Sequence, residues 1–447
     1  MSTIRVGIYT RERIRAVFHG EYKHGEEVIS GEKEICDAGW YIPMSEDCSF
    51  SLMDVTIGID FHWERNETQT FKGSLEVMKA KNGELTAVNV LDIEDYLQSV
   101  ISSEMSATSH MELLKAHAVI SRSWALCKIQ RSLEGSAFAC QESEGKRICW
   151  YGSEPHEGFD VCADDHCQRY QGLRAKDHKN AIKAVNETKG EVLAYLKEAF
   201  SLTVNNTSTS SATGKEGSAI ESLTPNSDYV ICDARFYKCC GGVTEEFETC
   251  WEDTHFDYLV KVEDNDANRS LDPIDLTTEE GAREWIMSSP EAFCNTNDKK
   301  ILSQVLNDYD QETIDFYRWK VVYSQEELTA LVARHASQLG KIINLIPLKR
   351  GVSGRIYELK IVGENESIII GKELEIRKWL SNSHLYSSAF VVEKENNTFT
   401  LYGAGWGHGV GLCQIGAAVM AEKGYTYKEI LAHYYPNTDL LPFDHLS

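Results

Sequence analysis

Glu104 is the residue of this sequence best placed for acid–base chemistry. It follows apolar residues at helical spacing (Tyr96, Leu97, Val100 and Ile101), so we expect it in the last turn of a helix. Apolar neighbours and the carboxyl end of a helix both disfavour a negative charge, which should raise the pKa of Glu104. A carboxyl that keeps its proton near neutral pH is a good general acid. The alternative is a solvated Glu at a helix end, which the local pattern alone favours.

A second helix is expected soon after Glu104. Ser109 and Glu112 have the spacing of a capping box, and residues 105–109 form a short Ser-rich turn before it. The apolar residues that follow, Leu113, Ala116, Ile120 and Trp124, share one helical face. Residues 96–126 therefore predict a helix pair that positions Glu104.

A second candidate for chemistry is a group of potential metal ligands, His156, Cys162, His166 and Cys167. Thiolate and imidazole ligands are those that tetrahedral zinc prefers. The spacing is not that of a zinc finger or ribbon, so these residues alone leave open a zinc site and a set of reduced, partly buried cysteines. Four protein ligands leave no position for an activated water, so such a zinc ion would be structural.

Composition limits the partners of the chain. The 447 residues carry a net charge of −24, which argues against nucleic acid and anionic membrane surfaces. No apolar run is long enough to span a bilayer, and the first residues lack a signal-peptide pattern. We expect either that the chain stays inside the cell or that an export segment was removed. Thirteen cysteines, an odd number, fit reduced thiols or metal ligands at least as well as a disulfide framework.

The order of elements predicts an α+β fold with mixed antiparallel sheets, a paired-helix catalytic segment and an inserted α/β sub-domain. Residues 1–90 alternate apolar and polar residues around an Asn82-Gly83 turn, which predicts a β-rich part. We expect a catalytic core over 91–260, the inserted sub-domain over 261–400, and a Gly-rich motif over 401–447 that completes the core. Within these parts we expect a polar flexible loop at 201–229 and a strand pair at 355–363 and 368–380.

The last region contains five alternating glycines, Gly403, Gly405, Gly407, Gly409 and Gly411. No dinucleotide-binding or Walker spacing fits them. Alternate glycines remove side chains from one face of the backbone, and we interpret that face as a surface that can lie flat against a sugar ring. Trp406 and His408 stand between the glycines, and Gln414 begins the next helix, where an amide can bind hydroxyls.

Taken together, these stretches resemble the SpoIID/LytB family, which contains stage II sporulation protein D and amidase-enhancer relatives. The matching residues are Glu104-Met105, Leu114-Lys115-Ala116, Arg122, the Gln168-x-Tyr170-x-Gly172 step and the Gly405-to-Ala417 motif. Cysteines replace the family's small hydroxyl residues at Cys239, Cys240 and Cys413. The replacement at Cys239 and Cys240 leaves open a redox-sensitive site, another metal-ligand pair and simple packing.

The resemblance implies a lytic transglycosylase that cleaves peptidoglycan glycan strands, with Glu104 as the single acid and base. It implies that Tyr170, Trp406, His408 and Gln414 bind the sugar, while Arg122 holds the helix pair or a substrate carboxylate. It also implies a structural Zn²⁺ at the His/Cys group and a place in the cell envelope or periplasm. The acidic composition favours strands that carry few peptides.

Two other functions stay open. Some members of the family enhance a cell-wall amidase, so the chain could be a non-catalytic glycan-binding module with an amidase partner. A zinc hydrolase would need an open ligand position, and no His-Glu-x-x-His motif is present.

Overall fold

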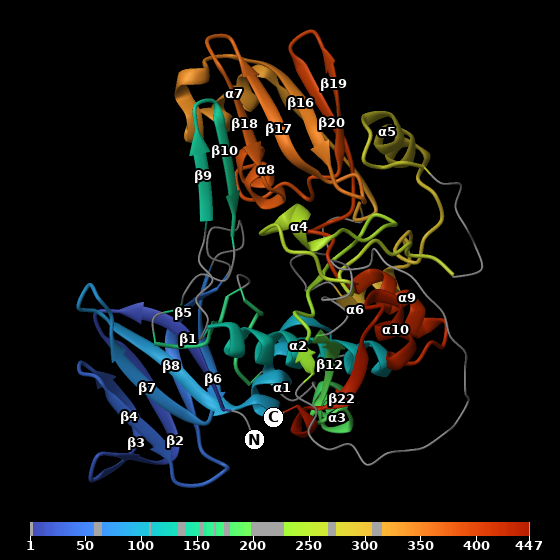
Figure 1. The fold of residues 1–447 in the computed structure, drawn as a ribbon. Helices are drawn as coiled ribbons and strands as arrows, with labels where there is room; N and C mark the ends of the chain where they lie inside the picture. The colour runs from blue at the N-terminus through green and yellow to red at the C-terminus, as the bar shows by residue number, and fades with distance from the viewer. Residues whose placement is uncertain are drawn as a thin grey trace, which may run out of the picture.

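The computed structural model describes residues 3–57, 65–106, 109–132, 139–151, 156, 158–164, 167–173, 179–197, 228–266, 274–305 and 315–446. The chain has the predicted α+β fold. Figure 1 shows its two largest sheets apart from each other, the N-terminal sheet mainly in blue and the second with β16 to β18 in orange and β9 and β10 in green. The loop predicted at 201–229 lies almost wholly outside the described residues.

The N-terminal sheet has nine strands, in the order β11-β1-β8-β7-β4-β2-β5-β6 with β3 paired to β2. Alternation of buried and exposed positions along these strands packs the rings of Phe18, Tyr22, Phe50 and Phe71 together inside. As predicted, the Asn82-Gly83 turn joins two strands, and Gly83 has φ +88°. The strand bounds are β1 Thr3–Arg11, β2 Ile14–His24, β3 Glu27–Ile35, β4 Gly39–Pro43, β5 Ser49–Ile57, β6 Arg65–Lys72, β7 Ser74–Lys79, β8 Leu85–Asp92 and β11 Val161–Cys162.

The predicted helix pair forms directly after β8, as α1 (Ile93–Glu104) and α2 (Met111–Ser132). The predicted capping box is wrong. The ring Nδ1 of His110 accepts the N–H of Glu112, while the Ser109 hydroxyl donates to the carbonyl of Gln304 at 2.8 Å. Ser109 therefore anchors the start of α2 to α6 (Lys299–Val305), a contact between segments that are distant in sequence.

A β-hairpin follows the helix pair where the sequence shows little periodicity. It consists of β9 (Ala139–Ser143) and β10 (Lys146–Trp150), and a disulfide joins Cys140 to Cys149 across it. The other eleven cysteines, all of them in described parts of the chain, form no disulfide bond. β10 pairs in parallel with β18 of the second sheet, so this hairpin links the helix pair to that sheet (Figure 1).

The second sheet has the order β16-β17-β18-β10-β9, and β16 to β18 lie in the region predicted as an inserted sub-domain, next to a three-stranded sheet, β15-β20-β19. One strand prediction there is wrong: β18 ends at Gly371, and the rest of the predicted strand is helix α8 (Glu373–Trp379). The reason is helical spacing, since Ile376, Trp379 and Leu380 are buried together. The elements are α5 Glu279–Ser288, β15 Arg318–Ser324, α7 Gln325–Ala336, β16 Ile342–Arg350, β17 Ile356–Gly363, β18 Ser367–Gly371, β19 Phe390–Glu395 and β20 Thr398–Ala404.

The end of the chain returns to the helix pair. β22 (Asp439–Pro442) pairs with β12 (Glu191–Leu196), and β21 (Leu412–Cys413) pairs with β14 (Phe236–Tyr237). Helices α9 (Gln414–Glu422) and α10 (Tyr427–Tyr434) pack against α2. The remaining elements are α3 Lys179–Glu187, β13 Tyr229–Ile231 and α4 Phe247–Cys250. None of the helices in the described part of the chain is both long and apolar enough to cross a bilayer.

Candidate active site

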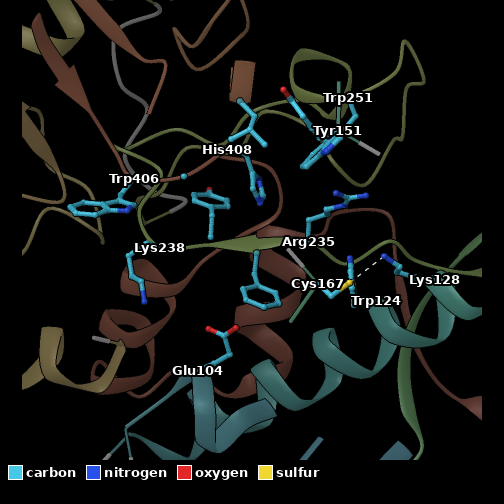
Figure 2. A pocket seen from close by; sticks show the side chains of 14 residues that line it. Glu104, Trp124, Lys128, Tyr151, Cys167, Arg235, Lys238, Trp251, Trp406 and His408 are labelled. Carbon is cyan, nitrogen blue, oxygen red and sulfur yellow. Dashed lines mark hydrogen bonds between the residues drawn. The ribbon is translucent and has the colours of Figure 1, made fainter. Parts of the chain in front are cut away.

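A groove of about 340 Å³ lies between the helix pair and the Gly-rich loop (Figure 2). Segments that are far apart in the sequence supply its lining. One group of lining residues comes from the helix pair and the loop beside it: Glu104, Trp124, Lys128 and Cys167. The other residues come from later segments, apart from Tyr151 beside the hairpin: Arg235, Phe236, Tyr237, Lys238, Trp251, Leu374, Trp406, Gly407 and His408.

Glu104 is the last residue of α1, and its half-buried side chain points toward the groove (Figure 2). The backbone N–H of Arg169 donates to Glu104 Oε1 at 3.1 Å. Next to it, the N–H of Gln171 donates to the Ser103 hydroxyl at 3.2 Å, so the 167–173 loop is fixed on the helix end. Among the described residues that line the groove, Glu104 is the one carboxylate. The raised pKa expected for Glu104 stays a prediction.

The groove is basic although the protein is acidic. Lys128, Arg235 and Lys238 line it together with the single carboxylate of Glu104. Arg235 forms two hydrogen bonds of 2.9 Å with Asp233 and lies 3.9 Å from the centre of the Trp251 ring. The excess of negative charge, −24 for the whole chain, therefore lies outside the groove lining. Composition alone could not show that the groove has the opposite sign of charge.

The Gly-rich loop brings Trp406, Gly407 and His408 to the groove, and two of its glycines also make room for a neighbouring segment. A Cβ atom on Gly407 would lie 2.9 Å from Cβ of Tyr237, and one on Gly411 would lie 2.1 Å from the carbonyl oxygen of Arg235. Both glycines have positive φ, +98° and +83°. At these two positions the missing side chain leaves room for the 235–240 segment, and whether the glycine face also contacts a sugar stays a prediction.

His408 is a neutral ring in this groove. Burial, followed by the charges of Arg235 and Arg355, holds the pKa of His408 well below its ordinary range. The N–H of Val410 donates to Nδ1 at 3.1 Å, so the proton of the neutral ring is on Nε2. Edge-to-face contacts with Tyr237 and Trp251 hold the ring in place. A neutral, oriented imidazole can position a hydroxyl without adding charge.

Three residues proposed to bind the substrate are not among the residues that line the groove. Tyr170 is 1% exposed and stacks on Tyr96, and its hydroxyl bonds to Asn89. Gln414 is buried, with its side-chain nitrogen 3.1 Å from Nε2 of His117.

Arg122, the third of these residues, is also 1% exposed. It donates to both carboxylate oxygens of Glu94, at 2.9 and 2.6 Å, and to the carbonyl of Glu191. These contacts join α2 to α1 and β12, which is the first of the two roles that the sequence left open for Arg122.

Three of the four expected metal ligands come together. The ligand atoms of His156, Cys162 and Cys167 lie within 4.8 Å of one another, and His156 Nε2 is 3.2 Å from Cys167 Sγ. Pairing of β11 with β1 places Cys162 on the edge of the N-terminal sheet. His166 lies outside the described residues. Two thiols and an imidazole suit tetrahedral zinc, so the donor set fits such an ion.

Sequence reasoning missed most of the basic and aromatic lining. Trp124 and Lys128 are four residues apart on α2, a spacing that places both on one helical face toward Glu104's end of the groove. Trp124 was assigned to the core face only. Arg235 and Lys238 flank the short strand β14, and no local pattern marked them.

Gln168 bridges the helix pair, because its side chain accepts a hydrogen bond from the Tyr96 hydroxyl on α1 and donates one to the carbonyl of Ser121 on α2.

The fold and the groove define a class of protein: an α+β chain in which a helix pair presents one carboxylate to a basic, aromatic groove. Residues 81–195 match the family model described as stage II sporulation protein. Residues 245–411 match a domain of unknown function (DUF8618). The part of the chain that contains the helix pair is thus similar to proteins of the SpoIID/LytB family.

Similar proteins differ in how much they share with this chain. An uncharacterized protein of Brachyspira hyodysenteriae is 26% identical over 369 residues, which cover 82% of this chain and 71% of that protein. The amidase enhancer of Bacillus subtilis is 38% identical over 69 residues, 15% of this chain and 10% of that protein. Stage II sporulation protein D of Bacillus amyloliquefaciens is 37% identical over 78 residues, 17% of this chain and 23% of that protein. The chain thus spans under a quarter of each of these last two proteins.

Proposed function

We propose that the chain is a peptidoglycan lytic transglycosylase in which Glu104 is both the acid and the base. The observation that carries this proposal is the single carboxylate in the described lining of the groove. Ordinary glycosidases need two carboxylates, one to protonate the leaving oxygen and one to activate water or attack the sugar. A single carboxyl is sufficient when the substrate supplies its own nucleophile.

The proposed step needs no water. Glu104 gives its proton to the glycosidic oxygen as the bond between that oxygen and C1 of the muramyl residue breaks. The C6 hydroxyl oxygen of the same residue bonds to C1, and its proton passes to the Glu104 carboxylate. The products are a 1,6-anhydromuramyl end and a free hydroxyl on the departing sugar, and Glu104 regains its proton. Trp406 and the neutral His408 hold the sugar in the groove.

The substrate and location follow from this proposal. Its substrate is a glycan strand of the cell envelope, and we keep strands with few peptides as the first substrate to test. The whole protein is acidic, but the groove is lined by basic residues. The groove itself should therefore not repel carboxylates of the substrate. His156, Cys162 and Cys167 would hold a structural Zn²⁺ that fixes the loop next to the groove. That ion would stabilise the loop and take no part in the proton transfers.

The decisive experiment compares wild type with Glu104→Gln on purified peptidoglycan, with and without stem peptides. The amide keeps an oxygen for the Arg169 N–H but cannot transfer a proton. We expect mass spectrometry to find 1,6-anhydromuramyl products with wild type and a loss of about 10²- to 10⁴-fold in the variant. Glu46→Gln, an exposed carboxylate in another part of the chain, is the matched control and should keep full activity.

The proposal is contradicted if neither wild type nor Glu104→Gln releases product from either substrate, because the groove then does not cleave glycan. The amidase-enhancer relative then directs the next test, which asks whether wild type and Glu104→Gln stimulate a cell-wall amidase equally. Equal stimulation would support a binding module in which Glu104 has no catalytic role.

A further inference from the structure

A second group of metal-type side chains lies in the core, apart from the groove lining. It contains Cys240, Asp264, Cys294 and Cys413, all between 0% and 3% exposed. One ligand atom from each lies within 4.8 Å of the others. Cys240 and Cys413 replace small hydroxyl residues of the family that the sequence resembles, and the sequence left a metal-ligand role open for Cys240.

The four residues come from four separate segments. Cys240 follows β14, Asp264 and Cys294 belong to loops on either side of α5, and Cys413 ends β21. The Sγ atoms of Cys240 and Cys294 are 3.3 Å apart. Tetrahedral zinc with bonds of about 2.3 Å to sulfur needs sulfur atoms about 3.8 Å apart. The group is therefore already close to the size of a zinc site.

Backbone N–H groups point at the sulfur atoms. The N–H groups of Cys240 and Gly416 donate to Sγ of Cys413, at 3.2 and 3.4 Å. The N–H of Gly242 donates to Sγ of Cys240 at 3.3 Å. Cys413 is the N-cap of α9, where the helix dipole also favours a thiolate. Such hydrogen bonds stabilise negative sulfur, as the outer shell of a metal–thiolate site does.

Asp264 gives an independent argument for a cation. Its carboxylate is 0% exposed, and it accepts hydrogen bonds from Cys294 N–H and from the hydroxyl of Tyr434, at 2.8 and 2.5 Å. Both donors are neutral, and burying an ionised carboxylate beside thiols without a positive charge is costly. A divalent cation between Asp264 and the sulfur atoms would compensate that charge.

We propose that Cys240, Asp264, Cys294 and Cys413 bind a structural Zn²⁺ ion in the core. Three thiolates and one carboxylate are a tetrahedral donor set suited to zinc, and they fill all four positions. Asp264 and Cys294 lie within the region that matches the domain of unknown function, whereas Cys240 and Cys413 lie just outside it. The ion would therefore fasten that region to the segments that carry the groove.

The ion would also affect the groove, because one ligand, Cys413, and the residue before another, Cys239, contact residues of the lining. Tyr237 pairs with Cys413, and the N–H and carbonyl of Cys239 both bond to Trp406. Removing the ion should therefore loosen Tyr237 and Trp406 together. This inference does not depend on the proposed function, because its test measures metal and stability rather than glycan cleavage.

The test measures zinc in protein purified under reducing conditions without chelator. His156→Ala/Cys167→Ala removes two ligands of the group beside the groove, so its zinc comes from the core group alone. We expect about one zinc per chain in that variant and about none when Cys294→Ser is added. Cys48→Ser, a buried cysteine outside the group, should leave the zinc content unchanged.

Spectroscopy keeps the inference testable if the Cys294→Ser protein does not fold. X-ray absorption at the zinc edge of the His156→Ala/Cys167→Ala protein should show about three sulfur and one oxygen ligands. Three results would overturn the inference: a metal-free protein with all three thiols reduced after exposure to Zn²⁺, a Cys240–Cys294 disulfide found by peptide mapping, or a zinc shell dominated by nitrogen.

Discussion

His117 is a buried residue whose ionisation should govern the acid stability of the fold. It is 0% exposed, with Nδ1 3.2 Å from the Ser121 hydroxyl and Nε2 next to Gln414. Burial, and then the charge of Lys238, lower the pKa of His117 to about 3. In the unfolded chain its pKa is about 6.5, so between these values only the unfolded state binds the proton.

We therefore expect His117 to make the protein less stable as the pH falls. The lowered pKa contributes stability that is fully present above about pH 6.5 and is lost toward about pH 3, at about 1.4 kcal/mol per pH unit. Urea unfolding across this range should show the advantage of wild type over His117→Gln shrinking with falling pH. An advantage that stays constant from pH 7 to pH 4 would contradict the assigned neutral state.

At the scale of single residues, types and motifs led to several residues that line the groove, but they did not indicate which way each side chain faces. Glu104, Trp406 and His408 line one groove, as the motifs indicated. Tyr170 and Gln414 also belong to motifs of the resemblance, but both are buried and neither is among the residues that line the groove. A motif records only identity and spacing, whereas the direction of a side chain depends on packing with segments elsewhere in the chain.

Between elements, the ion pair of Arg122 and Glu94 holds the helix pair together. Arg122→Met would leave the carboxylate of Glu94, 13% exposed, without its cation. Removing one partner of a buried pair costs about 3–5 kcal/mol. We expect denaturant unfolding to show this loss, and the double change with Glu94→Met to recover most of it. A variant of unchanged stability that binds glycan less tightly would assign Arg122 to the substrate instead.

The Gly-rich loop depends on close packing at Gly409. Gly409 has φ +89°, and a Cβ there would lie 2.4 Å from Cζ of Arg355. Arg355 donates to the carbonyl of Gly407 at 3.2 Å, so displacing it would move the loop that carries His408. We expect Gly409→Ala to cost about 1–3 kcal/mol of stability and to reduce glycan cleavage.

Gly424→Ala separates the two causes of that loss. Gly424 has a similar φ of +92° with no atom within 4 Å of an added Cβ. It therefore measures backbone strain without a clash. If both variants lose the same stability and both keep activity, packing against Arg355 does not position the loop.

Predictions of elements succeeded where periodicity was regular and failed where partners came from distant sequence. The helix pair and the Asn82-Gly83 hairpin follow from local pattern. The start of α2 does not follow from local pattern. The Ser109 hydroxyl donates to the distant carbonyl of Gln304, and the N–H of Glu112 is capped by His110 instead. The β9–β10 hairpin depends on pairing with β18, which no local pattern can indicate.

Over the whole molecule, charge is distributed so that the groove differs in sign from the surface. Lys238 lines the groove of a protein with net charge −24. We expect Lys238→Gln to weaken binding of peptide-bearing, carboxylate-rich glycan roughly two- to fivefold at low salt, and to change binding of peptide-free glycan less. Lys23→Gln, on the N-terminal sheet, is the control. Equal weakening for both glycans would show that Lys238 acts through structure, for instance through its bond to the carbonyl of Val305.

The two sources of the groove lining have a consequence for the order in which the site can form. Residues 81–195, which match the stage II sporulation protein model, supply Glu104 and Cys167, while Trp406 and His408 come from more than two hundred residues later. A chain that ended after the first region would carry Glu104 without Trp406 or His408. The groove can therefore be complete only after the end of the chain has folded back onto the segments around the helix pair.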